Sequence, residues 1–178
     1  MRTEITLVLG GARSGKSEAA ERIACRIGGP IAYVATGPVP VDDAEWAERV
    51  ARHQARRPPG WTTVEVGSGG NLPETLRSLR GPALVDSLGT WVAGSAGFGS
   101  ERAWGAFCEA LAVRRQAGHP TVVVSEEVGL GVHPSTEVGR EFRDALGTLN
   151  QLVSAVADVV LLVVAGRVLT LDPPGPVR

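Results

Sequence analysis

Short apolar runs alternate along the chain with longer segments in which apolar residues recur every three or four positions. The short runs predict buried strands, and the longer period predicts helices that lay one face on a sheet. We expect strands at 5–9, 31–35, 61–66, 83–86 and 121–125, and helices at 18–27, 42–57, 72–79, 104–111 and 136–156. Runs at 159–164 and 168–171, separated by Ala165-Gly166, predict a hairpin.

This alternation of strands and helices with short connections predicts an α/β fold in three layers, built on a mainly parallel sheet. The terminal hairpin adds an antiparallel edge. With 178 residues, of which 43% are hydrophobic, the chain is long enough to bury one substantial core. We therefore expect a single domain, 1–178.

Charge and composition narrow the classes of partner. A formal net charge of −1 provides no basic field, so we expect no nucleic-acid partner. No apolar stretch reaches membrane-spanning length and no leader-like segment opens the sequence, so we expect no membrane span and a cytoplasmic location. Cys25 and Cys108 fall within helical apolar patterns, which predicts reduced, buried thiols.

A phosphate-binding loop is predicted between the first strand and the first helix. The residues there fit the pattern G-x-x-x-x-G-K-[ST], and they are Gly10, Gly11, Ala12, Arg13, Ser14, Gly15, Lys16 and Ser17. In such loops the backbone N–H groups wrap the phosphates, the lysine reaches the outer phosphates and the hydroxyl binds Mg²⁺. Lys16 is the only lysine among 18 basic residues. The sequence therefore predicts a nucleoside triphosphate site with Lys16 as a catalytic residue.

Acidic residues follow two of the predicted core strands. Asp86 ends the strand at 83–86, where a carboxylate is favoured if it holds a cation, so Ser17 and Asp86 are predicted as the Mg²⁺ ligands. Glu126 and Glu127 follow the strand at 121–125. Either could orient Mg²⁺ or accept a proton from an acceptor hydroxyl, and a solvated pair of loop charges fits the position equally well.

One histidine lies among arginines on the predicted helix before residue 58. His53 shares a helical face with Arg49, Arg56 and Arg57. Neighbouring cations disfavour imidazolium, which leaves a neutral nucleophilic nitrogen, and they can also neutralise departing pyrophosphate. A solvated helix face fits the same spacing, so the pattern alone leaves both interpretations open.

Taken together, these residues resemble the bifunctional adenosylcobinamide kinase / adenosylcobinamide-phosphate guanylyltransferase family, over residues 5–171. The marks of the resemblance are 10–17 with Glu21, Tyr33-Val34-Ala35-Thr36, Arg49-Val50, His53-x-x-x-Arg57-Pro58-x-x-Trp61, Asp86-x-Leu88-x-x-Trp91, Glu127-Val128-Gly129-x-Gly131-Val132-x-Pro134, Arg140-x-Phe142-Arg143-Asp144 and Leu149-Asn150-Gln151. Relatives usually have asparagine where this chain has Glu126 and Gly94.

The resemblance implies a P-loop fold related to recombinase-type ATPases, an assembly of three subunits, and two reactions on a corrinoid. ATP or GTP would phosphorylate adenosylcobinamide. GTP would then guanylylate His53, which would pass GMP to adenosylcobinamide phosphate. Guanine-nucleotide contacts are implied at Ala35, Thr36, Gly37, Gln54, Ala55, Arg56, Arg57, Glu65 and Asp86.

Two other functions are compatible with a P-loop. One is a single-activity small-molecule kinase in which His53 is inert. The other is a regulatory GTP-binding switch, but such switches usually carry an Asn-Lys-x-Asp motif, and with Lys16 as the only lysine the chain has none.

Overall fold

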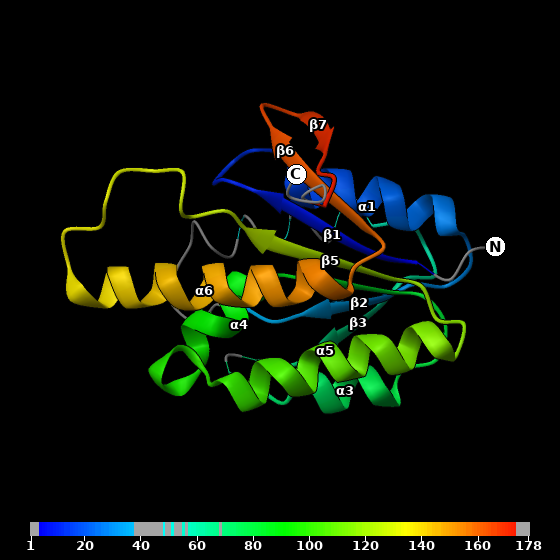
Figure 1. Cartoon of the computed structure of the whole chain (residues 1–178). Helices are drawn as coiled ribbons and strands as arrows, with labels where there is room; N and C mark the ends of the chain where they lie inside the picture. Colours follow the sequence, from blue (N-terminus) through cyan, green and yellow to red (C-terminus); the bar gives the residue numbers. More distant parts are fainter. Residues whose placement is uncertain are drawn as a thin grey trace, which may run out of the picture.

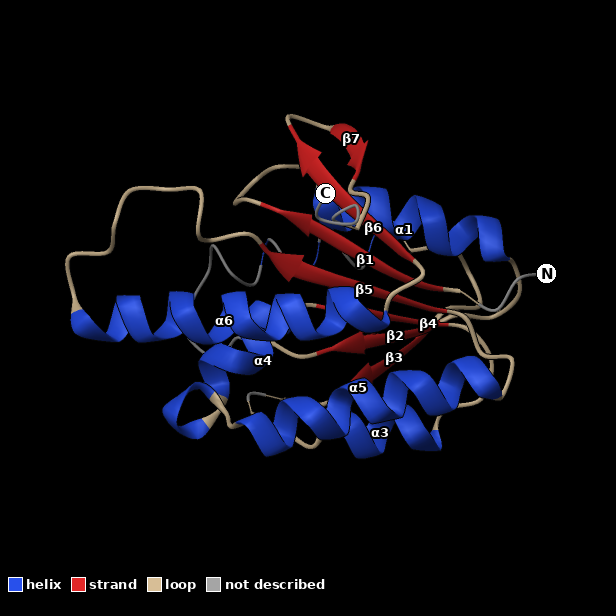
Figure 2. Cartoon of the chain, viewed as in Figure 1, coloured by secondary structure: helices blue, strands red, loops and turns tan. Residues whose placement is uncertain are grey.

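Seven strands form one sheet in the order β3-β2-β4-β5-β1-β6-β7 (Figures 1 and 2). The structure is a computed structural model and describes residues 4–37, 48, 51, 55, 57–67 and 69–173. The strands are β1 Ile5–Gly10, β2 Ala32–Ala35, β3 Thr62–Glu65, β4 Ala83–Asp86, β5 Thr121–Glu126, β6 Val159–Val164 and β7 Arg167–Thr170. The helices are α1 Lys16–Ile27, α3 Leu72–Ser78, α4 Leu88–Gly94, η1 Ala96–Phe98, α5 Glu101–Gln116 and α6 Glu137–Val156.

Every strand pair is parallel except β6–β7, which confirms the parallel sheet with an antiparallel terminal hairpin. Alternate residues of the central strands enter two separate cores, as the pleat requires. Leu7 and Val123 join one core, and Val8 and Val122 join the other. These are the two faces of a three-layer fold.

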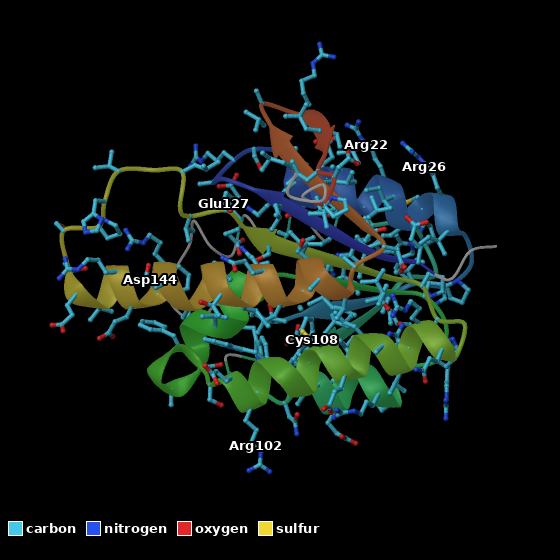
Figure 3. All side chains as sticks on the ribbon, in the orientation of Figure 1. Arg22, Arg26, Arg102, Cys108, Glu127 and Asp144 are labelled. Carbon is cyan, nitrogen blue, oxygen red and sulfur yellow. The ribbon has the colours of Figure 1, made fainter. Side chains whose placement is uncertain are left out.

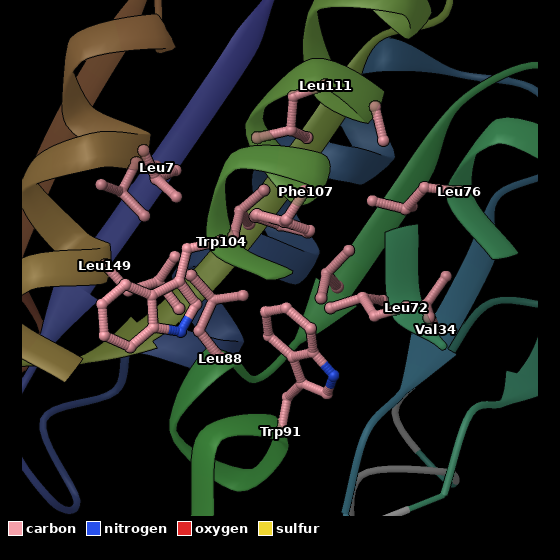
Figure 4. Close-up of a cluster of buried hydrophobic side chains, with 14 of the residues drawn as sticks. Leu7, Val34, Leu72, Leu76, Leu88, Trp91, Trp104, Phe107, Leu111 and Leu149 are labelled. Atoms are coloured by element: carbon pink, nitrogen blue, oxygen red, sulfur yellow. The ribbon is translucent and has the colours of Figure 1, made fainter. Parts of the chain in front are cut away.

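The larger core lies between the sheet and helices α3 to α6 (Figure 4). The smaller core lies under α1. Trp91 of α4 packs on Phe107 of α5 with ring centroids 5.5 Å apart. The small Ala20 and Ala24 bring α1 close to the other face of the sheet. Close packing of α1 fixes the position of the phosphate loop that precedes it.

Several predicted boundaries differ from the structure. Helix α1 begins at Lys16 rather than at residue 18, and helix α4 was not predicted. Cys25 is exposed, so the prediction that both thiols are buried was wrong; the buried side of α1 carries Ala20, Ala24 and their neighbours instead. Of the helix predicted for 42–57, the structure describes residues 48, 51 and 55 as helical, and most of the remainder lies outside the described residues.

Cys108 is half-buried on α5, and burial raises the pKa of its thiol. Within the described part of the chain, no helix is both long and apolar enough to cross a membrane.

Arg114 is a fully buried cation that joins three elements. Its guanidinium donates hydrogen bonds to the carbonyl oxygens of Leu76, Leu79 and Gly81 at 2.7–3.1 Å and to Thr121 Oγ1 at 2.8 Å. Burial lowers the pKa of the group to about 10, so it stays charged at neutral pH. The planar fork of arginine matches these separate acceptors, which ties α5 to α3, to the turn before β4 and to the start of β5.

We expect Arg114→Met to destabilise the fold by about 3 kcal/mol or more, because each buried acceptor left without a donor costs about 1–3 kcal/mol. Urea denaturation followed by circular dichroism measures the loss. Arg102→Met is the matched control, because Arg102 lies on the same helix and points to solvent (Figure 3), so a change within about 0.5 kcal/mol is expected. An equal loss in the two variants would show that the buried bonds contribute nothing.

Candidate nucleotide site

The phosphate loop lies where the sequence predicts it, between the end of β1 and the start of α1. A Cβ at Gly10 would lie 2.5 Å from Ser14 Oγ and 2.7 Å from the carbonyl oxygen of Val163, so only glycine fits there. Gly15 caps α1 with φ +93°, a conformation that favours glycine. The amide of Gly166 donates to the Ser14 carbonyl at 2.8 Å, so the β6–β7 turn packs on the loop.

Lys16 reaches across this loop toward the end of β5. Its side chain is 5% exposed, and its Nζ lies 3.4 Å from Glu126 Oε1 and 3.4 Å from the Gly11 carbonyl oxygen. The ammonium is therefore held at the mouth of the loop, on the side where outer phosphates bind in P-loop proteins. The catalytic role of Lys16 stays a prediction.

The predicted metal ligands come together. Ser17 Oγ donates to Asp86 Oδ1 at 3.4 Å, and Tyr33 OH donates to Asp86 Oδ2 at 2.7 Å. Burial, followed by the charge of Asp86, raises the pKa of the Tyr33 phenol well above its usual range, so the phenol remains a donor. The pair offers a carboxylate and a hydroxyl, the oxygen donors that Mg²⁺ prefers. Among the described residues no three His, Cys, Asp or Glu side chains gather, so phosphate oxygens and water would complete the coordination.

Glu126 is held by an unpredicted set of groups at the start of α4. Ser87 Oγ lies 3.0 Å from both of its carboxylate oxygens, and the amide of Gly89 donates to Oε2 at 3.0 Å. Ser87 caps α4 through a capping box with Thr90. A serine three residues before threonine, ahead of an apolar run, is the signal that could have predicted this helix and its cap.

Four of the residues predicted to contact the nucleoside lie at neighbouring strand ends. In register, Ala35 is opposite Glu65 on one side and Asp86 on the other. The buried Thr36 hydroxyl donates to the Ser87 carbonyl at 2.6 Å, and the chain continues to Gly37. The structure therefore brings Ala35, Thr36, Glu65 and Asp86 to one edge of the sheet.

Arg57 contacts β2 and β3 at a residue pair that lies two positions before these strand ends. Its guanidinium lies 3.4 Å from the centroid of the Tyr33 ring and donates to Thr63 Oγ1 at 2.8 Å. Ala55 is an exposed helical residue. The other candidates of this segment lie outside the described residues; they are His53, Gln54 and Arg56.

A sequence profile described as cobinamide kinase / cobinamide phosphate guanyltransferase, CobU, matches residues 6–171. This chain belongs to that family. The bifunctional adenosylcobalamin biosynthesis protein CobP of Pseudomonas aeruginosa is 38% identical over 165 residues, which is 90% of this chain and 92% of that protein. The corresponding CobU protein of Escherichia coli K12 is 35% identical over 179 residues, covering 90% and 95% of the two chains.

Membership of the cobinamide kinase / cobinamide phosphate guanylyltransferase family makes the chain a bifunctional enzyme of cobalamin biosynthesis. A solved structure, the flagellar accessory protein FlaH of Methanocaldococcus jannaschii, matches 94% of this chain and 75% of its own at a TM-score of 0.51. Its sequence identity is 12%, so it supports the fold alone. The profile and the relatives confirm the predicted family, and the FlaH structure agrees with the predicted fold.

Proposed function

We propose that one triphosphate site serves two successive transfers. In the first, the hydroxyl of adenosylcobinamide attacks the γ-phosphorus of ATP or GTP, and the nucleoside diphosphate leaves. In the second, a His53 nitrogen attacks the α-phosphorus of GTP and pyrophosphate leaves. A phosphate oxygen of adenosylcobinamide phosphate then displaces the histidine, which gives adenosylcobinamide-GDP.

The observation that carries this proposal is the convergence of Lys16, Ser17 and Asp86 at the mouth of the phosphate loop. Lys16 and Ser17 come from the first turn of α1 and Asp86 from the end of β4, and Ser17 Oγ lies 3.4 Å from Asp86 Oδ1. Lys16 Nζ lies 3.4 Å from the Gly11 carbonyl oxygen of the loop. Backbone N–H groups of a glycine-rich loop, a helix amino terminus and one ammonium are complementary to a triphosphate. The phosphates would then contact the loop amides, the amino end of α1 and the Lys16 ammonium.

Mg²⁺ fits the pair formed by Ser17 and Asp86, since both present oxygen atoms and they already lie in contact. When bound, the ion would neutralise charge on the phosphates and help to align the leaving group. Tyr33 holds Asp86 in place through its second oxygen. The described residues thus supply the ion with an oriented carboxylate rather than with a complete set of ligands.

The role of His53 in the second reaction rests on the family resemblance, because His53 lies outside the described residues. Among the described residues, Arg57 brings positive charge close to the predicted metal ligands, since its guanidinium packs on Tyr33, which donates a hydrogen bond to Asp86. That charge would help to neutralise the departing pyrophosphate.

Labelling with GTP that carries a radioactive α-phosphate tests the proposal. We expect the protein to retain label that is acid-labile and base-stable, the behaviour of a phosphoramidate. Addition of adenosylcobinamide phosphate should discharge the label into adenosylcobinamide-GDP. A protein that phosphorylates adenosylcobinamide but never takes up label would be the single-activity kinase.

We expect Asp86→Asn to weaken both transfers by about 10²-fold at low Mg²⁺, because a neutral amide holds the ion less well than a carboxylate. Titrating Mg²⁺ in each assay should show that the variant needs a higher concentration and partly recovers. Equal Mg²⁺ dependence of the variant and the parent protein would argue against Asp86 as a ligand.

We also infer a homotrimer in the cytoplasm, which the family resemblance supports. Sedimentation equilibrium of the purified protein tests the assembly, and a monomer at micromolar concentration would contradict it.

A further inference from the structure

The carboxylate of Glu126 occupies a distinct place beside the phosphate loop. It ends β5, the strand that lies between the phosphate-loop strand β1 and the Asp86 strand β4. Its side chain is 24% exposed, so the carboxylate is accessible at the site but mostly shielded from solvent. Every described partner of its two oxygens is a donor group, namely Lys16, Ser87 and Gly89.

Binding of a triphosphate would change this set of partners. Lys16 would turn from Glu126 Oε1 to the phosphate oxygens, since these carry more charge. The contacts from Ser87 and Gly89 do not involve the phosphate loop, so they can continue to hold the carboxylate. One oxygen of a fixed carboxylate would then face the outer phosphate with a lone pair available.

We propose that Glu126 is the catalytic base of phosphoryl transfer and has no part in guanylyl transfer. Its freed oxygen accepts the proton of the corrinoid hydroxyl while that hydroxyl oxygen bonds to the γ-phosphorus. The bond from the γ-phosphorus to the bridging oxygen breaks, and the nucleoside diphosphate takes that electron pair. The proton on Glu126 passes to solvent after the product leaves. The inference rests on the kinase reaction proposed above.

The carboxylate of the neighbouring Glu127 accepts its hydrogen bond within its own loop. Glu127 Oε1 accepts a hydrogen bond from the Gly129 amide at 2.6 Å, within its own loop. Its backbone amide donates to the Gly10 carbonyl at 3.0 Å and so fixes the turn (Figure 3 labels its side chain). Of the two adjacent glutamates left open by the sequence, Glu126 alone contacts Lys16 among the described contacts.

Glu126→Gln keeps the shape of the side chain and removes its basicity. We expect kcat for phosphorylation of adenosylcobinamide to fall by about 10²-fold or more, the usual contribution of a general base. The KM for triphosphate and the rate of self-labelling from GTP should stay within about threefold of the parent values. Self-labelling therefore reports folding and nucleotide binding in the same sample.

Gly89→Ala provides a second, positional variant. A Cβ at Gly89 would collide with Glu126 Oε2, the flexible end of a side chain, so the carboxylate should move at little cost to the fold. We expect phosphorylation to slow by at least tenfold, with an unchanged thermal midpoint. Glu109→Gln is the matched control, since Glu109 lies on α5 with a 77% exposed side chain. It should leave both rates unchanged.

Three results with Glu126→Gln would overturn the inference. One is a normal kinase rate in Glu126→Gln. Another is an equal loss of phosphorylation and self-labelling, which would mean that Glu126 serves triphosphate binding through Lys16. The third is recovery of the variant at high Mg²⁺, which would make Glu126 a metal ligand. A parent protein that takes up label but never phosphorylates adenosylcobinamide would refute the kinase reaction itself, and the inference with it.

Discussion

Replacing His53 by alanine should remove all covalent label from the protein and slow guanylyl transfer by at least about 10³-fold, because the covalent path requires a nucleophile. Phosphorylation of adenosylcobinamide should fall less than about tenfold, since that transfer occurs at the γ-phosphorus. The measurement is a pair of assays on one preparation: retention of α-phosphate label, and formation of adenosylcobinamide phosphate from ATP.

The chain offers a matched control for this variant. It has three histidines. His133 is exposed on the loop between β5 and α6 and contacts Arg143 at 2.9 Å, so His133→Ala should keep both activities. His119 is less suitable, because its Nδ1 accepts the amide of Gly81 at 3.2 Å and supports the fold. Label that persists in His53→Ala, or an equal loss of both activities, would contradict a role confined to guanylyl transfer.

Lys16→Ala should reduce both reactions by about 10²-fold or more, since the ammonium meets phosphates of the same bound triphosphate in each. The loss should appear in kcat/KM for ATP in the kinase assay and for GTP in self-labelling. Direct titration with a fluorescent triphosphate analogue would show whether Lys16→Ala impairs triphosphate binding or a later step.

Lys16→Arg tests whether geometry or charge matters. The Lys16 side chain is 5% exposed, and among the described residues its Nζ contacts the Gly11 carbonyl and Glu126, each at 3.4 Å. A planar guanidinium is larger and cannot replace a compact ammonium in that space. We expect Lys16→Arg to stay at least tenfold below the parent protein. Full activity in Lys16→Arg would show that positive charge alone suffices, and a loss confined to one reaction would argue against a shared site.

The phosphate loop and the strand ends were predictable because their signals are local. Gly10 and Gly15 are required by close contacts and by a positive φ, and a strand followed by a helix surrounds them in the sequence itself. Asp86 and Glu126 ended apolar runs, so a parallel sheet was enough to place both at one edge. The family resemblance, and with it the pair of reactions, also came from the sequence.

Tertiary contacts decided the features that local sequence signals did not predict. Helix α4 is only seven residues long and buries Leu88 and Trp91 against distant elements, so its sequence carried little helical periodicity. The choice between Glu126 and Glu127 depended on Lys16 and Ser87, which lie far from them along the chain. The role of Arg114 likewise depended on carbonyls that lie 33–38 residues away.

The sequence by itself therefore determined which residues can perform the chemistry, since residue type and local spacing fix the phosphate loop, the strand ends and the candidate nucleophile. Only the tertiary structure decided which of them meet. Hydrogen bonds and ion pairs depend on distances between side chains from different strands, and packing of α1 and α4 on the sheet sets those distances.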